Sequence, residues 1–327
     1  MSDTTSHKLT DHKVIIFDVY GTLADWESGI FNNLQPLISK YPAARAWTRK
    51  DVLDAFSSVE TDVQTQYPDM LYSDVLAKVH EALEERLKAL SGKEPSQSSL
   101  PSNPDAEATS SAGASTSSGG NIQPHDAHRA FGNSIQHWAI FPDTCDALRR
   151  LAKHYKLVVL SNVDRASFRH THALLAEGPT HASVTSNAGT YTYPDPNPNK
   201  YWHPQETPNS RSPFTLIVTA QDTGCYKPAL GGFRAVLEYI ASQPEVFENV
   251  GNTADSVVEK TLSVAQSLPH DHEPAHALGM RSVWIDRQGA LTCNVTPGGP
   301  EAKDKWTWRF ETLGQMADAV EKELANA

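Results

Sequence analysis

The chain has 327 residues, of which 39% are hydrophobic, and a formal net charge of −11 at pH 7. This length allows one large domain or two modest ones, with enough material for a sizeable core. The acidic balance offers no basic stripe of the kind that a phosphate backbone needs, so we expect a small-molecule substrate and no nucleic-acid partner.

The cysteine content and the hydropathy of the chain bear on its compartment. Cys145, Cys225 and Cys293 are scattered, and none belongs to a CxxC pair. This usage is too sparse for a disulfide framework and indicates a reducing compartment. No run approaches the roughly 20 apolar residues of a membrane span, and the first residues are polar. The sequence therefore predicts a cytoplasmic protein without membrane contact.

The first predicted elements are one strand and a group of helices. The apolar run VIIF at 14–17 has the composition of a buried strand and leads directly into Asp18. Farther along, residues 49–90 carry apolar side chains at helical spacing and predict two or more amphipathic helices that pack on each other. These apolar residues are Val52, Leu53, Phe56, Val59, Val75, Leu76, Val79, Leu83, Leu87 and Leu90.

Two segments lack regular patterning. Residues 92–124 are dominated by Ser, Pro, Gly and Ala, and we expect a disordered loop there. Residues 187–213 repeat prolines, which prevent regular hydrogen-bonded ladders, and also contain four aromatic residues. We interpret this Pro-rich insertion as a surface loop, with a lid near a pocket as the alternative.

Further short apolar runs alternate with helical patterns in the second half of the chain. The runs lie at 157–160, 215–218, 262–265 and 282–285, and the helical patterns include residues 143–155. Together with the run at 14–17, this alternation predicts an α/β fold with a five-stranded parallel sheet covered by helices on both faces.

The residues that follow these runs carry the chemistry. Ligands of open α/β sheets bind at the carboxyl ends of the strands, so polar residues at those ends should converge. They are Asp18 after the first run, Ser161 and Asn162 after the second, Lys227 beyond the third, and Ser267 and Asp271 after the fourth.

This set of residue types points to a carboxylate nucleophile. A carboxylate at a buried strand end takes up a proton unless a cation favours its charged form, and Lys227 can supply that cation. Asp18 could then attack carbon or phosphorus and form an ester, while Ser161 and Asn162 hold the developing charge. Asp271, or a histidine beside it such as His270, is placed to activate water or to orient the lysine.

Four motifs together resemble the haloacid dehalogenase superfamily. They are DVYGTL at 18–23, LSN at 160–162, YKP at 226–228 and the run from Ser267 to Arg287, and they stand in the superfamily's order. Within it the chain is most similar to type II 2-haloacid dehalogenases, and to a fungal-looking set with the sequence AQSxxHDHxPA.

The resemblance implies a domain organisation and a set of roles. It implies a HAD-like Rossmannoid core over 12–24 and 140–323, a helical cap of the C1 type inserted over 25–139, and allows a homodimer through the cap helices. It implies catalytic roles for Asp18, Lys227 and Asp271. Substrate-binding roles fall to Tyr20, Thr22, Ser161, Asn162, Ser267 and His270.

Two positions argue against the phosphatases of this superfamily. These carry a second acid where this chain has Tyr20, because an alkoxide leaving group needs a proton and halide does not. Gln266 stands where many of them have a metal-binding acid, and without these carboxylates a magnesium site is poor in hard oxygen ligands. We therefore expect no cofactor, with Mg²⁺ needed only if the chain is an atypical phosphatase.

The chain also departs from the dehalogenases. These usually carry an arginine in the first cap helices, whereas this chain reads DAFSSVETDVQ there and has Arg45 and Arg49 only upstream. Phe233 and Leu268 replace a tyrosine and an asparagine, which makes the expected pocket more apolar. The sequence thus favours a larger, less charged substrate, and we expect one of a fungal-type secondary metabolism. Two alternatives to halide displacement remain, a tailoring enzyme that opens or rearranges an epoxide or similar strained ring, and an atypical phosphatase.

Overall fold

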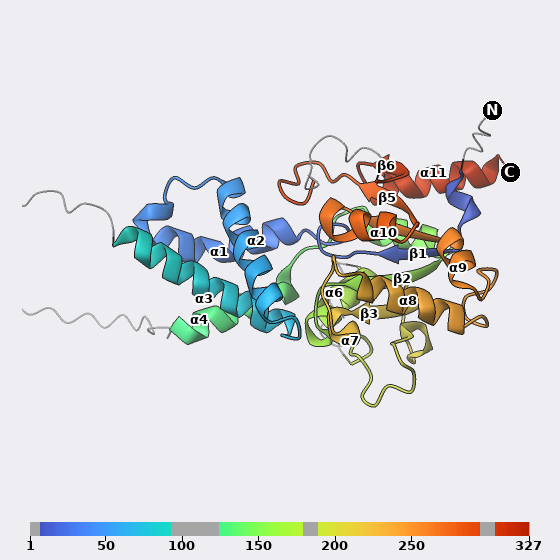
Figure 1. Ribbon diagram of the computed structural model, residues 1–327, viewed down its shortest axis with the longest axis horizontal. Coiled ribbons are helices and arrows are strands. Elements are labelled where there is room, and N and C mark those ends of the chain that lie inside the picture. Colours follow the sequence, from blue (N-terminus) through green and yellow to red (C-terminus); the bar gives the residue numbers. More distant parts are fainter. Residues whose placement is uncertain (1–6, 93–123, 179–188, 295–304, 327) are drawn as a thin grey trace, which may run out of the picture.

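The computed structural model describes residues 7–92, 124–178, 189–294 and 305–326. Its centre is a parallel sheet of six strands in the order β3-β2-β1-β4-β5-β6 (Figure 1). The strands are β1 (Val14–Phe17), β2 (Lys156–Ser161), β3 (Leu216–Thr219), β4 (Thr261–Ala265), β5 (Arg281–Ile285) and β6 (Trp308–Phe310). Phe17 at the end of β1 pairs with Val159 on one side and Val264 on the other. The first strand is therefore central, and its carboxyl end lies beside both neighbouring strands.

The parallel sheet is confirmed, but the prediction of five strands was wrong by one. The sixth strand, β6, adds three residues to the edge of the sheet, with Trp308 paired to Val283 of β5. Its residues are only partly buried or exposed. A segment this short and this exposed has neither the length nor the continuous apolar run by which a buried strand is recognised.

Helices cover both faces of the sheet, as predicted. The side chains of β1 alternate, so that Ile15 and Phe17 join one buried cluster while Val14 and Ile16 join another. Helices α5 and α11 pack in the first cluster and α8 in the second. The helices of this part are α5 (Thr144–Leu151), α6 (Arg165–Glu177), α7 (Ala220–Thr223), α8 (Leu230–Ser242), α9 (Ala254–Lys260), α10 (Glu273–Ala277) and α11 (Leu313–Ala325).

A second group of helices lies beside the sheet, at the left of Figure 1. In the sequence, these helices lie between β1 and β2. It consists of α1 (Trp26–Lys40), α2 (Arg49–Gln66), α3 (Tyr72–Ser91) and α4 (Pro124–Gly132). The predicted helices of residues 49–90 are α2 and α3, and Thr48 begins α2 through a capping box with Asp51. We call α1 to α4 the cap. Residues 93–123 of the predicted disordered loop lie outside the described residues.

Single turns complete the described structure. They are the 3-10 turns Leu9–Asp11, Pro42–Ala44, Asn133–His137 and Pro204–Glu206, and the π turn η6 (Leu268–His272). No helix in the described ranges is long and apolar enough to cross a membrane.

The described part of the Pro-rich insertion, residues 189–213, runs along the outer edge of the sheet. Ile217 of β3 donates a backbone hydrogen bond to Trp202 at 2.9 Å, which forms an antiparallel bridge. Tyr191 and Trp202 are buried against His172 of α6. This segment therefore shields an edge strand, and none of its described residues reaches the pocket in front of Asp18.

Candidate active site

The carboxyl ends of β1, β2 and β4 hold the predicted nucleophile. Asp18 directly follows β1, and its backbone N–H donates to Val264 of β4 at 3.1 Å. One carboxylate oxygen, Oδ1, accepts from Lys227 Nζ at 2.9 Å, and Oδ2 accepts from Thr22 Oγ1 at 2.6 Å. The residue is 8% exposed. Its carboxylate is thus fixed in direction and compensated in charge, while one side still meets a pocket.

Lys227 is the cation at the centre of the site. Its ammonium donates to Asp18, to Asp271 Oδ1 at 2.7 Å and to the carbonyl oxygen of Leu160 at 3.0 Å. An ammonium has three N–H donors, and all three are used. Burial lowers the pKa of Lys227, but the neighbouring Asp18 and Asp271 carboxylates outweigh this effect, so that the pKa is raised. Lys227 therefore stays charged although it is buried.

Asp271 shares the ammonium with Asp18. It lies in the π turn η6, which Ser267 begins by accepting a hydrogen bond from the His270 backbone at 3.2 Å. Burial raises the pKa of Asp271 to about 7, against the opposing effect of Lys227. Its Oδ2 is buried without a hydrogen-bond partner among the described residues. Asp271 thus combines a raised pKa with an oxygen that has no hydrogen-bond partner among the described residues.

Two of the predicted substrate-binding residues hold the catalytic groups instead of lining the pocket with free polar atoms. The Asn162 amide donates to the Lys227 carbonyl at 3.0 Å and accepts from the Lys227 backbone N–H at 2.7 Å. Thr22 is fully buried, donates to Asp18 and accepts from the backbone N–H of Gln266 at 2.9 Å. Both side chains therefore position the Asp18–Lys227 pair.

A pocket of about 710 Å³, part of it open to solvent, lies in front of Asp18 between the sheet and the cap. Of the predicted residues it is lined by Asp18, Tyr20, Asn162, Lys227, Ser267, His270 and Asp271. Thr22 and Ser161 do not line it. The Ser161 hydroxyl is buried and finds no partner in the part of the chain that the structure describes.

The two ring side chains of this set are both held by hydroxyl groups. The Tyr20 hydroxyl bonds with Thr171 Oγ1 at 2.9 Å, and burial raises the pKa of Tyr20, so its phenol stays protonated. His270 Nδ1 bonds with Ser267 Oγ at 2.9 Å. Burial and the nearby Lys227 lower the pKa of His270 to about 4. The imidazole is therefore neutral at neutral pH and adds no charge to the pocket.

The cap side of the pocket contains residues that the sequence analysis missed. They are Ser57, Glu60, Thr61 and Gln64 of α2 and Tyr72 of α3. The polar residues of α2 recur three and four positions apart, and this polar stripe beside the apolar one was the signal available in the sequence. Arg45 is exposed. Arg49 lines a different pocket, and its guanidinium also lies over the Phe31 ring.

The donor set of a magnesium site is not assembled here. Both oxygens of Asp18 are engaged by Lys227 and Thr22, and the Gln266 side chain donates away from them, to the Thr292 carbonyl at 3.0 Å. Across the described ranges, no group of three or more His, Cys, Asp or Glu side chains is placed to hold a metal ion. The site residues therefore do not fit a bound divalent cation.

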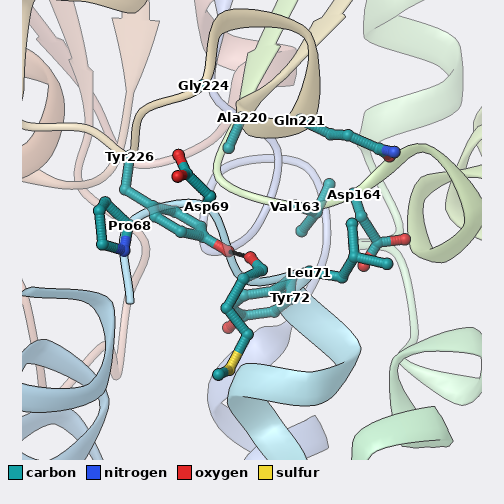
Figure 2. A pocket seen from close by; sticks show the side chains of 11 residues that line it. Pro68, Asp69, Leu71, Tyr72, Val163, Asp164, Ala220, Gln221, Gly224 and Tyr226 are labelled. Atoms are coloured by element: carbon teal, nitrogen blue, oxygen red, sulfur yellow. Dashed lines mark hydrogen bonds between the residues drawn. The ribbon is translucent and has the colours of Figure 1, made fainter. Parts of the chain in front are cut away.

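A second pocket marks the junction between cap and sheet, and Figure 2 shows it from close by. The Tyr226 hydroxyl donates to the carbonyl oxygen of Met70, in the loop between α2 and α3, at 2.6 Å. The backbone N–H of Ser73 donates to Asp164 at 3.2 Å. Tyr226 directly precedes Lys227, so this contact joins the cap to the loop that carries the lysine. Tyr72 lines both pockets.

Comparison with solved structures identifies the architecture. The L-2-haloacid dehalogenase of Xanthobacter autotrophicus with covalently bound chloropropionic acid aligns over 95% of this chain and 98% of its own, with a TM-score of 0.53 and 14% identity. The chain has the haloacid dehalogenase fold. Another structure with this fold, the L-2-haloacid dehalogenase PA0810, covers 94% of this chain and 99% of its own at 15% identity and a TM-score of 0.51.

The same fold is shared by a magnesium-bound protein. The Bacillus subtilis protein YfnB bound to magnesium aligns over 95% of this chain and 99% of its own, at 13% identity and a TM-score of 0.53. No protein-family model matches the sequence, and no curated protein matches it. At these identities the likeness establishes the haloacid dehalogenase fold, and the reaction has to be argued from the site.

Proposed function

We propose that the chain is a hydrolase of the haloacid dehalogenase type, in which Asp18 displaces a leaving group at carbon through an ester intermediate. Halide is the first candidate leaving group. One observation carries the proposal: a buried carboxylate, paired at 2.9 Å with a buried ammonium, borders a pocket between sheet and cap. A carboxylate so placed is a nucleophile with little water around it.

The reaction would proceed in two steps. An Asp18 oxygen attacks the substrate carbon, the carbon–halogen bond breaks and halide leaves with the bonding electrons. Water then attacks the carboxyl carbon of the ester, and the free oxygen of Asp271 accepts its proton. The ester cleaves to an alcohol and the Asp18 carboxylate, and Asp271 returns the proton to solvent. Lys227 compensates the Asp18 charge before the attack and again after hydrolysis of the ester, and we propose that no metal ion takes part.

Isotope labelling tests the ester. The enzyme in excess is mixed in ¹⁸O-water with chiral 2-chloropropionate or 2-chloropropionamide for a single turnover, and the peptide that contains Asp18 is weighed by mass spectrometry. We expect ¹⁸O in the Asp18 carboxyl group and ¹⁶O in the first product. Asp18→Asn should form no product, whereas Asp255→Asn, at an exposed acid in α9, should behave as wild type. Labelled product with an unlabelled Asp18 would refute the ester mechanism.

A second candidate, the opening or rearrangement of an epoxide or similar strained ring, is favoured by one further observation. Glu60 on the cap borders the same pocket, and burial raises its pKa to about 7. A protonated carboxyl group there could deliver a proton to the oxygen released on ring opening. Without an ester step, this reaction should partly survive Asp18→Asn, which separates the two candidates. The sequence AQSLPHDHEPA at 265–275 resembles a fungal-looking set of sequences. This resemblance supports a place in fungal-type secondary metabolism for either of the two proposed reactions.

A further inference from the structure

The cap contributes a polar face to the candidate active site. Helix α2 turns Ser57, Glu60, Thr61 and Gln64 toward the pocket, three or four residues apart, and its apolar stripe faces the interior of the cap. Glu60 is the charged member of this face. The lining residues of α2 and α3 thus offer hydroxyl, amide and carboxyl groups, and Trp26 of α1 adds an indole ring. None of the lining residues from the described cap is basic.

The charges around the pocket do not suit an anionic substrate. Three acids line it, Asp18, Glu60 and Asp271, and Lys227 is the basic residue among the described lining residues that carries a charge at neutral pH. All three N–H groups of Lys227 are already bonded. A substrate carboxylate would therefore enter next to acids and find no free cation, and an unpaired charge is costly to remove from water.

A hydrogen bond fixes the position of the Glu60 carboxyl group on this polar face. The Tyr72 hydroxyl donates to Glu60 Oε1 at 2.8 Å, and Tyr72 itself is buried. No described residue donates to Glu60 Oε2, which leaves that oxygen free for a bound molecule. Burial raises the pKa of Glu60 to about 7, so the group can present either a carboxyl proton or a charged acceptor. The contact with Tyr72 fixes the carboxyl group on the pocket side of α2.

We propose that Glu60, held by Tyr72, selects an uncharged substrate that carries an amide, hydroxyl or similar polar group beside the attacked carbon. That group hydrogen-bonds to Oε2 of Glu60, the oxygen that Tyr72 leaves free. The proposal deepens the proposed function and rests on it, because it assumes that Asp18 attacks carbon in this pocket. In this chain, Glu60 is then the residue that determines specificity.

A matched pair of probes tests the selection. 2-Chloropropionamide and 2-chloropropionate have nearly the same shape and differ by one charge. The rate of ester formation on Asp18 is measured for each by mass spectrometry of the Asp18 peptide, and the ratio of the two rates is compared between variants, which cancels the intrinsic reactivity of the probes. We expect Glu60→Gln to shift this ratio toward the carboxylate by about tenfold, and Glu60→Arg to reverse the preference.

Control variants separate selection from damage to the fold. Asp62→Asn makes the same change of charge on the exposed side of α2 and should leave the ratio unchanged. Tyr72→Phe keeps the Glu60 charge but removes its bond, and should weaken the preference for the amide less than Glu60→Gln does. Thermal unfolding followed by circular dichroism verifies that each variant is folded.

The outcomes distinguish this inference from the proposed function. Esterification of Asp18 with the same ratio in wild type, Glu60→Gln and Glu60→Arg would overturn the role of Glu60 and leave the nucleophile intact. Faster reaction of wild type with 2-chloropropionate than with the amide would also overturn it. If neither probe esterifies wild-type Asp18, both proposals fall together.

Discussion

Replacement of Lys227 by methionine removes the cation that two buried carboxylates share. Met has a similar length, so the main loss is the charge, with its bonds to Asp18 at 2.9 Å and to Asp271 at 2.7 Å. Removal of one partner from a buried ion pair costs about 3–5 kcal/mol. We expect a loss of this size in the free energy of unfolding at pH 8, and no ester formation on Asp18.

The cost of Lys227→Met should depend on pH, and the sign follows from proton binding. In the variant the two carboxylates repel each other without a cation, and a proton on one of them relieves the repulsion. Folded wild type already has a raised pKa at Asp271, but without the lysine the folded variant binds still more protons than folded wild type, so the cost of the substitution rises with pH. Since one pKa unit corresponds to about 1.4 kcal/mol, the cost at pH 5 should be smaller than at pH 8 by roughly 2 kcal/mol.

Urea unfolding of wild type and variant at pH 5 and pH 8 measures this difference. The matched control is Lys50→Met, which breaks an exposed pair with Asp54 on α2 and should cost less than about 0.5 kcal/mol at either pH. An equal cost of Lys227→Met at both pH values, or a cost below about 1 kcal/mol at pH 8, would refute the picture of a buried cation shared by two acids.

Two further predictions concern residues around the site. Asn162→Ala removes both hydrogen bonds to the Lys227 backbone and should lower the free energy of unfolding by about 1–2 kcal/mol. In steady-state assays it should lower kcat more than it changes KM. An unchanged kcat would contradict this role. Burial lowers the pKa of His172 to about 3, so the unfolded chain binds a proton that the folded chain does not, and stability is lost as pH falls below about 6.5. His172→Phe should lose less stability than wild type between pH 6.5 and 4.5, by about 2–3 kcal/mol in urea unfolding, and parallel pH curves would argue against it.

The sheet could be predicted because its strands are buried on both sides. β1 to β5 appear in the sequence as continuous apolar runs, and their order along the chain, with helices between them, implies parallel pairing. β6 was not predicted, because an edge strand with exposed side chains does not require a continuous apolar run. The sheet order was not predicted either, because it depends on packing between segments far apart in the chain.

The part of the site that lies at the sheet, as opposed to the cap, could be predicted for a related reason. Asp18 and Lys227 each follow a strand run or its loop, and the carboxyl ends of parallel strands meet at one edge. What the sequence could not supply was the direction of each side chain. Asn162 and Thr22 have polar groups that suit a ligand, yet both bond to the groups that they hold in place. Glu60 was missed because its position depends on how the cap docks.

The hydrogen bond between Tyr226 and Met70 links entry to the pocket with the state of the lysine. A swing of the cap away from the sheet has to break this 2.6 Å contact, which lies one residue from Lys227. The ion pair of the neighbouring Lys227 is largely buried, with side chains 3% and 9% exposed, so such a displacement would expose it to water. One hydrogen bond thus ties the docking of the cap to the burial of the Asp18–Lys227 pair.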